Sequence, residues 1–342
     1  MISTRSESGF SLIELLVAIT LLLVVSSIVT SALMQMTQSQ TTIWNRTEMH
    51  SGIRGATELL QQEVGQAGRA ALSATVSLLA PVGPTAGGPC NPDTPTAPGD
   101  TVAVVSKDDK GNVVTSVNGI NPLSGIFAQA GANPSYMLMA TLDGDNQEVV
   151  KIGAVDQVAS TITACFANPH LAGTVLMPIG AFATGIVPNV GIANGSTATV
   201  LKLYGDIIGD GNMVYVEYTC DTVNHNLYRN VMRYDAVAKP AVTNAQILLS
   251  NIIDNPGGTD CFTYQTTKLN VQGIDVYFVL DVAVTLTVQT QQLDPITKQY
   301  QTETKALLNV SPRNVFTAWE MASLDFTDHV QSTPVSVTAL LP

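Results

Sequence analysis

The sequence predicts an α+β protein in which one long N-terminal helix packs on an antiparallel β-sheet domain. Two observations support this fold class. Leu15 through Asn45 contains no charged residue and the first proline is Pro81, so a helix can continue well beyond the apolar run. From Thr101 onward, short β-prone runs alternate with turn residues, which is typical of hairpins.

The composition narrows the class of function. The 342-residue chain has 15 basic and 27 acidic residues and a formal charge of −12. Nucleic-acid binding is therefore not expected, because phosphate contacts need clustered Lys and Arg. Charged residues make up only 12%, and Thr, Val, Ala and Gly are plentiful. This composition is typical of a β-rich secreted or surface domain.

The long apolar run begins at a carboxylate, Glu14. A cleaved secretory signal is disfavoured because the run is too long and Glu14 stands where basic residues are expected, although Thr30-Ser31-Ala32 resembles a weak cleavage site. A plain transmembrane anchor fits the length, because about 20 apolar residues cross a bilayer. It gives no reason for Glu14, whose charge costs roughly 2.5–3.5 kcal/mol at the membrane centre.

A third interpretation explains the carboxylate. If the leader of residues 1–9 is removed after Gly9, Phe10 becomes a new N-terminus, and its amine is cationic near neutral pH. That amine on one chain can neutralise Glu14 on a neighbouring chain once their helices pack together. Glu14 is then a device for assembly.

The run Gly9-Phe10-Ser11-Leu12-Ile13-Glu14 resembles the type III signal of type IV pilins and of type II secretion pseudopilins. The resemblance implies cleavage between Gly9 and Phe10 by a prepilin peptidase, N-methylation of Phe10, and assembly into a filament. The implied partners are other minor and major pilins and the assembly machinery of the bacterial inner membrane. Arg5 stays cytoplasmic and the domain beyond the single span is exported, finally to the pilus or cell surface.

Residues 10–80 are expected to form the long helix, with 10–34 in the membrane or filament core and 35–80 packing on the domain. A helix from Phe10 to about Leu72 is predicted, with a bend or break near Ser51–Gly55 where glycines weaken it. Apolar residues at three- and four-residue spacing define the packing face: Ile53, Ala56, Leu60, Val64, Ala67 and Ala71.

Residues 81–342 are expected to form the exported β-rich domain, after an irregular connection over Pro81 to Gly99. The longest predicted strand is Asp275–Thr290, with Tyr300–Val310 as its antiparallel partner. Three hairpins are predicted from pairs of β-prone runs around turn residues: Thr101–Ser106 with Val113–Val117, Tyr136–Leu142 with Glu148–Val155, and Thr197–Tyr204 with Met213–Thr219.

Several short segments beyond the N-terminus recur in an order that carries a second, looser resemblance. They are Leu59–Gly68, Tyr215–Tyr218, Asn226–Arg229, a helix-like Ile247–Ile253, Cys261–Tyr264 and Ser311–Asn314. The chain resembles PilW-type minor pilins and, more distantly, J-type minor pseudopilins, although Gly65 replaces a basic residue often found there. The resemblance implies a minor pilin in pilus assembly or initiation near the tip. The alternatives are a minor pseudopilin of a type II secretion system and a surface adhesin or DNA-uptake pilin.

The four cysteines show no C-x-x-C spacing and no neighbouring histidine, so no zinc site is predicted. An exported domain is expected to hold up to two disulfides among Cys90, Cys165, Cys220 and Cys261, with three connectivities open. Cys220 with Cys261 is preferred because each lies at the edge of a predicted strand. Buried free thiols are the alternative.

No H-E-x-x-H, G-x-S-x-G or P-loop pattern occurs, so neither an enzyme nor a cofactor is expected. The histidines His50, His170, His225 and His329 show no spacing with cysteines or carboxylates. Asp143, Asp145 and Glu148 offer oxygen ligands at near-alternate positions but lack the rest of an EF-hand, so a solvated turn is preferred over a metal site. Arg229 is expected to make strand-end or turn hydrogen bonds.

Overall fold

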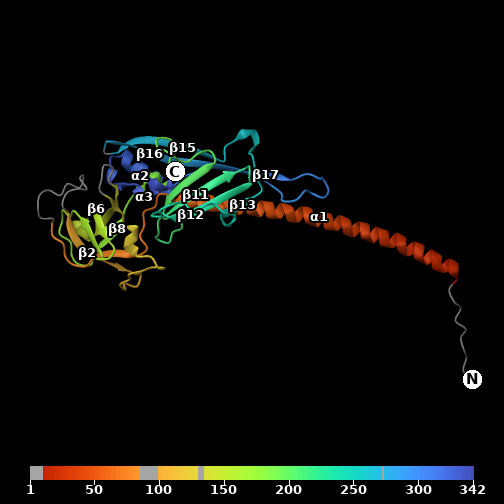
Figure 1. Cartoon of the computed structure of the whole chain (residues 1–342), viewed down its shortest axis with the longest axis horizontal. Helices are drawn as coiled ribbons and strands as arrows, with labels where there is room; N and C mark the ends of the chain where they lie inside the picture. The colour runs from red at the N-terminus through yellow and green to blue at the C-terminus, as the bar shows by residue number, and fades with distance from the viewer. Residues whose placement is uncertain (1–10, 85–98, 130–134, 272) are drawn as a thin grey trace, which may run out of the picture. The chain divides into compact units, whose positions relative to one another are not determined.

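Figure 1 shows a computed structural model that describes residues 11–84, 99–129, 135–271 and 273–342. A long apolar helix is followed by antiparallel β-structure, which confirms the α+β fold class. By close contacts the chain forms two units, which are described separately. The first contains the helix up to Gly52 together with Gln289–Glu303, and the second contains Ile53–Val288 and Thr304–Pro342.

The N-terminal helix, α1, spans Leu12–Gln66 without interruption. Of the bend or break predicted near Ser51–Gly55, the break is therefore wrong. Ile53 and Ala56 are buried, and the exposed Arg54 Nε donates a hydrogen bond to Glu58 Oε1 one turn further on, at 2.7 Å. Tertiary burial and local pairing offset the weak helix propensity of the glycines in this stretch.

The helix ends about six residues before the predicted Leu72, because Gly68 adopts φ +82°, the left-handed conformation that commonly follows a helix. The Gly68 N–H donates to the Tyr204 carbonyl at 2.8 Å. Asn314 Nδ2 donates to the carbonyls of Gln66 and Ala67, which have no partner within the helix. Residues 67–80 thus belong to the globular part and not to the long helix.

A small closed barrel follows the helix. In spatial order its strands are β1 (Thr75–Leu78), β2 (Asp100–Lys107), β7 (Thr161–Ala164), β6 (Val149–Asp156), β5 (Leu138–Leu142) and β8 (Val175–Pro178). The predicted hairpin over 136–155 is confirmed by the β5–β6 pairing, in which Leu138 lies opposite Lys151.

The predicted hairpin of Thr101–Ser106 with Val113–Val117 is wrong, because β2 pairs with β1 and β7 instead. The Asp108 carboxylate accepts hydrogen bonds from the Lys110 and Asn112 N–H groups and forms a local turn. Val113 makes only an isolated bridge with Lys107 and is 65% exposed, so this run buries too little apolar surface to form a strand.

Two four-stranded sheets make up most of the remaining domain. One has the order β10 (Val200–Gly205), β11 (Val214–Asp221), β12 (Asn226–Arg233) and β13 (Ile247–Ser250). The other has β14 (Ile252–Ile253), β16 (Ile274–Gln289) and β15 (Phe262–Val271), with β17 (Thr302–Val310) also paired to β16. The predicted 197–219 hairpin and the predicted long strand with its partner are confirmed.

The predicted helix over Ile247–Ile253 is wrong. Its residues form β13, on the edge of β12, and β14, which pairs with β16 in the other sheet. Asn251, at φ +61°, lies between the two strands where the chain passes from one sheet to the other. A disulfide joins Cys220 of β11 to Cys261, the residue before β15. This confirms the preferred pairing of the sequence prediction. Cys165 is also disulfide-bonded, and Cys90 lies outside the described residues.

Short elements complete the domain. The strand pairs are β3 (Ala128–Gln129) with β4 (Ser135–Tyr136) and β9 (Ala181–Phe182) with β18 (Val330–Gln331), and the helices are α2 (Arg313–Ser323) and α3 (Val335–Leu340). Trp319 of α2 packs against a core that contains Phe278 and Val315. The tail residues Val337, Leu340 and Leu341 belong to the core that contains the barrel interior.

Candidate functional site: the N-terminal helix and the polar contacts of the domain

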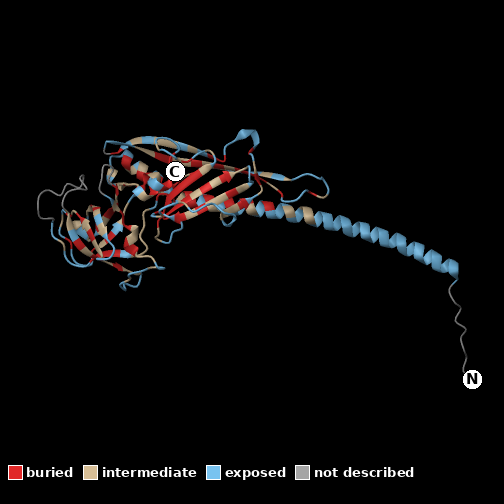
Figure 2. Ribbon diagram, viewed as in Figure 1, coloured by how far each residue is buried: buried red, intermediate tan, exposed pale blue. Residues whose placement is uncertain are grey.

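The first half of α1 is an apolar surface that no part of the described chain covers. Every large apolar side chain from Leu12 to Met36 is exposed, and Figure 2 shows this part of the helix as a continuous exposed segment. α1 is long and apolar enough to span a bilayer. An exposed apolar surface of this extent marks contact with a membrane or with other protein chains.

Glu14 lies in the first turn of α1, where its carboxylate accepts a hydrogen bond from the Ser11 backbone N–H at 3.0 Å. A carboxylate in this position satisfies a free N–H group and interacts favourably with the positive end of the helix dipole. Glu14 therefore has a local capping role in addition to the charge-pairing role that its sequence position predicts. Gly9 and Phe10, the predicted processing residues, lie outside the described residues.

The second half of α1 is held on the first sheet by a buried ion pair. Glu63, on the apolar side of the helix, is only 4% exposed. Its carboxylate accepts hydrogen bonds from Arg229 Nε of β12, 3.1 Å from each oxygen, and from the Tyr218 hydroxyl of β11. Arg229 thus pairs with the helix and does not make the strand-end or turn contacts that the sequence predicted.

The protonation states of this group follow from its surroundings. Burial raises the pKa of the Tyr218 hydroxyl and the nearby Glu63 charge raises it further, so the phenol stays a neutral donor. Burial opposes the charge on Arg229, but its hydrogen bonds and attraction to Glu63 more than compensate and raise its pKa. A buried carboxylate is tolerated here because two donors from neighbouring strands compensate for its lost hydration.

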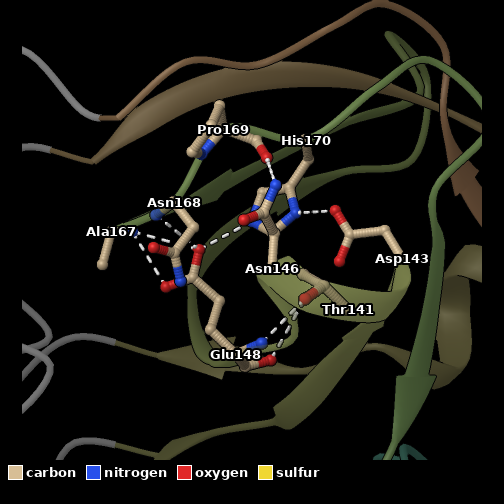
Figure 3. A network of polar contacts seen from close by, with 8 residues as sticks. All are labelled: Thr141, Asp143, Asn146, Glu148, Ala167, Asn168, Pro169 and His170. Carbon is tan, nitrogen blue, oxygen red and sulfur yellow. Dashed lines mark hydrogen bonds and ion pairs between the residues drawn. The ribbon is translucent and has the colours of Figure 1, made fainter.

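Two of the three acidic residues considered as calcium ligands instead enclose a histidine, as Figure 3 shows. The His170 side chain is fully buried, with Nδ1 2.5 Å from Asp143 Oδ2 and Nε2 2.6 Å from Glu148 Oε1. Asp145 lies in the short 3₁₀ turn Gly144–Asn146 between them. The absence of a histidine–carboxylate pattern in the sequence was misleading, because the partners come from segments more than 20 residues apart.

The same contacts hold two loops of the barrel together. Glu148 accepts hydrogen bonds from the Ala167 and Asn168 N–H groups, and Asn146 Nδ2 donates to the Pro169 carbonyl. The β5–β6 turn is thereby tied to the loop that follows β7. Both imidazole nitrogens already face carboxylates, and no group of His, Cys, Asp and Glu suited to a metal ion occurs among the residues that the structure describes.

A pocket of ≈ 640 Å³ lies in the second unit, where β5 and β6 meet the β15–β16 turn and β18. Its walls include Tyr136, Leu138, Val190, Ile192, Val276 and Tyr277. The volume lies within the range of small-ligand sites. Two polar residues of the pocket already have partners. Asp275 forms an ion pair with Lys268 at 2.6 Å, and the buried Gln331 side chain hydrogen-bonds to the backbone of Leu138 and Ile179. The pocket wall is therefore mainly apolar surface, with few polar groups free to react.

Comparison with known proteins identifies the N-terminal segment of the chain. The family model for the prokaryotic N-terminal methylation motif matches residues 4–30. This match and the apolar helix support a type IV pilin-like class of protein, and the motif implies processing by a prepilin peptidase and a context of pilin assembly. No curated protein and no solved structure matches the chain.

Removal of the buried carboxylate should destabilise the domain. Glu63→Ala leaves Arg229 half-buried without its counter-ion and the Tyr218 hydroxyl without its acceptor, so we expect the free energy of unfolding to fall by about 3 kcal/mol. Urea denaturation of the full chain in detergent, followed by circular dichroism, measures it. Glu58→Ala is the matched control, because it removes only an exposed, solvent-screened ion pair on the same helix and should cost much less stability. Equal losses would contradict the proposed role of Glu63.

The His170 cluster should make stability depend on pH. Burial disfavours its charged form, but the hydrogen bonds and charges of Glu148 and Asp143 outweigh burial and raise the pKa of His170. Its stabilising contribution is therefore complete below the unfolded value near 6.5 and is lost as pH rises through the higher folded value. We expect His170→Gln to remove part of the stability loss that occurs as pH rises above about 6.5, measured by urea midpoints. The partly exposed His329→Gln should leave that profile unchanged, and identical profiles for His170→Gln and the parent would contradict the assignment.

Proposed function

We propose that this chain is a minor type IV pilin of the PilW type, which acts in pilus assembly or initiation near the pilus tip. The supporting observation is the exposed apolar half of α1 with Glu14 at its head, within the matched methylation motif. A chain with such a helix needs either lipid or other apolar helices around it. Filament assembly transfers the helix from the first environment to the second.

In this proposal a prepilin peptidase cuts between Gly9 and Phe10, and Phe10 is N-methylated. The chain first resides in the inner membrane with one span, its N-terminus in the cytoplasm and its domain exported. It then joins other minor and major pilins through the inner-membrane assembly machinery. No enzymatic activity or cofactor is proposed. The Cys220–Cys261 disulfide of the second unit suits an exported domain, because disulfides persist in oxidising compartments.

Processing changes the electrostatics of Glu14. In the precursor, the Ser11 N–H and the helix dipole face its carboxylate. Cleavage creates an amine at Phe10, whose unperturbed pKa near 8 keeps it charged at neutral pH. An ion pair between this amine and Glu14 of a neighbouring chain is strong in a low-dielectric helix bundle. Cleavage therefore supplies the partner that makes Glu14 tolerable within apolar surroundings.

A minor pseudopilin of a type II secretion system is the alternative, because it needs the same motif and the same helix. The domain beyond α1 favours the minor pilin, since its barrel and two sheets are bulky to repeat along a shaft but fit a tip. Neighbouring genes separate the two: other minor pilins support the proposal, and a secretin with pseudopilins supports the alternative.

Deletion of the gene should abolish or strongly reduce surface pili, and re-expression of the full chain should restore them. Pili counted by electron microscopy and pilus-dependent motility are the measurements. Mass spectrometry of the complementing chain should show an N-methylated Phe10 as its first residue. Normal piliation with lost protein secretion would favour the pseudopilin, and an uncut chain or a cut near Ala32 would overturn both assignments.

Two substitutions separate the capping role of Glu14 from its proposed charge-pairing role. Glu14→Gln keeps an oxygen that accepts from Ser11 N–H but removes the charge, whereas Glu14→Ala removes both. We expect both variants to insert normally and to enter filaments at least about tenfold less than the parent, as for loss of a buried ion pair. Immunoblots of membranes and of sheared pili provide the measurements. Glu48→Gln, an exposed carboxylate further along α1, is the control, and normal incorporation of Glu14→Gln would show that capping alone explains Glu14.

A further inference from the structure

In the first unit, the loop between β16 and β17 lies along one face of α1. Three helix residues at four-residue spacing contact this loop or the start of β17, so they share a single face. The pairs are Thr42 with Asp294, Arg46 with Gln301, and His50 with Glu303. Asp294 orders the loop, because its side-chain carboxylate accepts hydrogen bonds from the backbone N–H groups of Ile296 and Thr297. This loop therefore braces a stretch of helix beyond the apolar span.

The opposite face of the same stretch carries an exposed tryptophan. Trp44 lies two residues from both Thr42 and Arg46, which is about 200° around the helix and thus away from the loop. Its side chain is 75% exposed, whereas Met49, on the braced side, is 9% exposed. Trp44 is one of only two tryptophans in the sequence, and Trp319 packs within the second unit. Ile43, the neighbour of Trp44, is also exposed, at 64%, so two large apolar side chains expose adjacent surface on this stretch, and contiguous apolar surface marks an interaction site.

Lipid does not explain Trp44. The closely spaced exposed apolar run ends at Met36, and the six polar residues 37–42 separate it from the exposed Ile43 and Trp44. Even if the hydrocarbon core extended to Met36, Trp44 would lie ~12 Å further along the helix axis. The headgroup layer adds only about 5–8 Å on each side of the core. The ring therefore lies beyond the interfacial layer in which membrane proteins place tryptophan.

We propose that Trp44 is the anchor by which this helix binds the apolar N-terminal helix of a neighbouring filament subunit. The inference rests on the proposed function. The occupant is a helix like residues 12–36 of this chain, because such helices carry uncovered apolar surface once they leave the membrane. The brace holds the Trp44 face in one orientation, which lowers the entropy lost on binding. Tryptophan is among the residues that most often dominate the energy of an interface.

The direct test places a photo-crosslinking amino acid at position 44 of the full chain in piliated cells. After irradiation, mass spectrometry should identify an adduct with a peptide from the apolar N-terminal segment of another subunit. The same group at Val158, a 98% exposed barrel residue, is the matched control and should give no such adduct. Adducts with lipid, with another class of protein, or none in filaments that contain the chain would overturn the inference and leave the proposed function intact.

A second measurement uses variants that should fold. Because the ring is exposed in the free chain, Trp44→Ala should leave near-ultraviolet circular dichroism from the domain and processing at Phe10 unchanged. We expect its amount in sheared pili to fall by about tenfold or more, and Trp44→Phe to keep most of the parental amount. Val158→Ala is the control. Normal incorporation of Trp44→Ala would overturn the inference, whereas a parent chain that is never processed or incorporated would overturn the proposed function with it.

Discussion

The buried carboxylate of Glu63 is the constraint on which the docking of the helix depends. An unpaired charge at this depth costs several kcal/mol, and only Arg229 and Tyr218, on two neighbouring strands, compensate for it. A shift of one residue along the helix would rotate Glu63 by about 100° away from both donors. Apolar packing of Leu60 and Val64 holds the helix on the sheet but tolerates small slides. The ion pair therefore fixes the register and the orientation of the second half of α1.

Buried polar groups also connect other segments of the domain that are distant in sequence. His170 ties the β5–β6 turn to the following loop, and Gln331 connects β18 to β5. Buried Lys202 donates to the carbonyls of Asn194 and Leu341, and burial with the nearby Lys239 charge lowers its pKa. Each group bonds segments that are distant in the chain, so each specifies an arrangement that apolar contacts alone leave open. Their directional bonds give the small barrel and the sheets a single way to fit together.

Features set by local pattern were predictable from the sequence, and features set by distant partners were not. Uncharged residues over 15–45 predicted the helix, and alternation over 275–290 predicted the longest strand. Ile247–Ile253 was misassigned because a short apolar run fits either a helix or a strand, and the open edge of β12 decided the outcome. Glu63–Arg229 and the His170 cluster were missed because their members lie far apart in sequence. For the assembly segment, Glu14 was recognisable from its local pattern, but Trp44 became notable only when the structure placed the brace on the opposite face.

The two halves of α1 are positioned by different physical interactions. The second half binds one fixed surface and uses a buried ion pair to set its register. The first half is apolar throughout, and apolar attraction is non-directional, so one such helix can slide along another at small cost. Register between neighbouring subunits must then come from groups with direction or distinctive shape. Glu14 and Trp44 lie 30 residues apart, which is about 45 Å along the helix axis. A charge at one end and an aromatic ring at the other restrict sliding far more than either does alone.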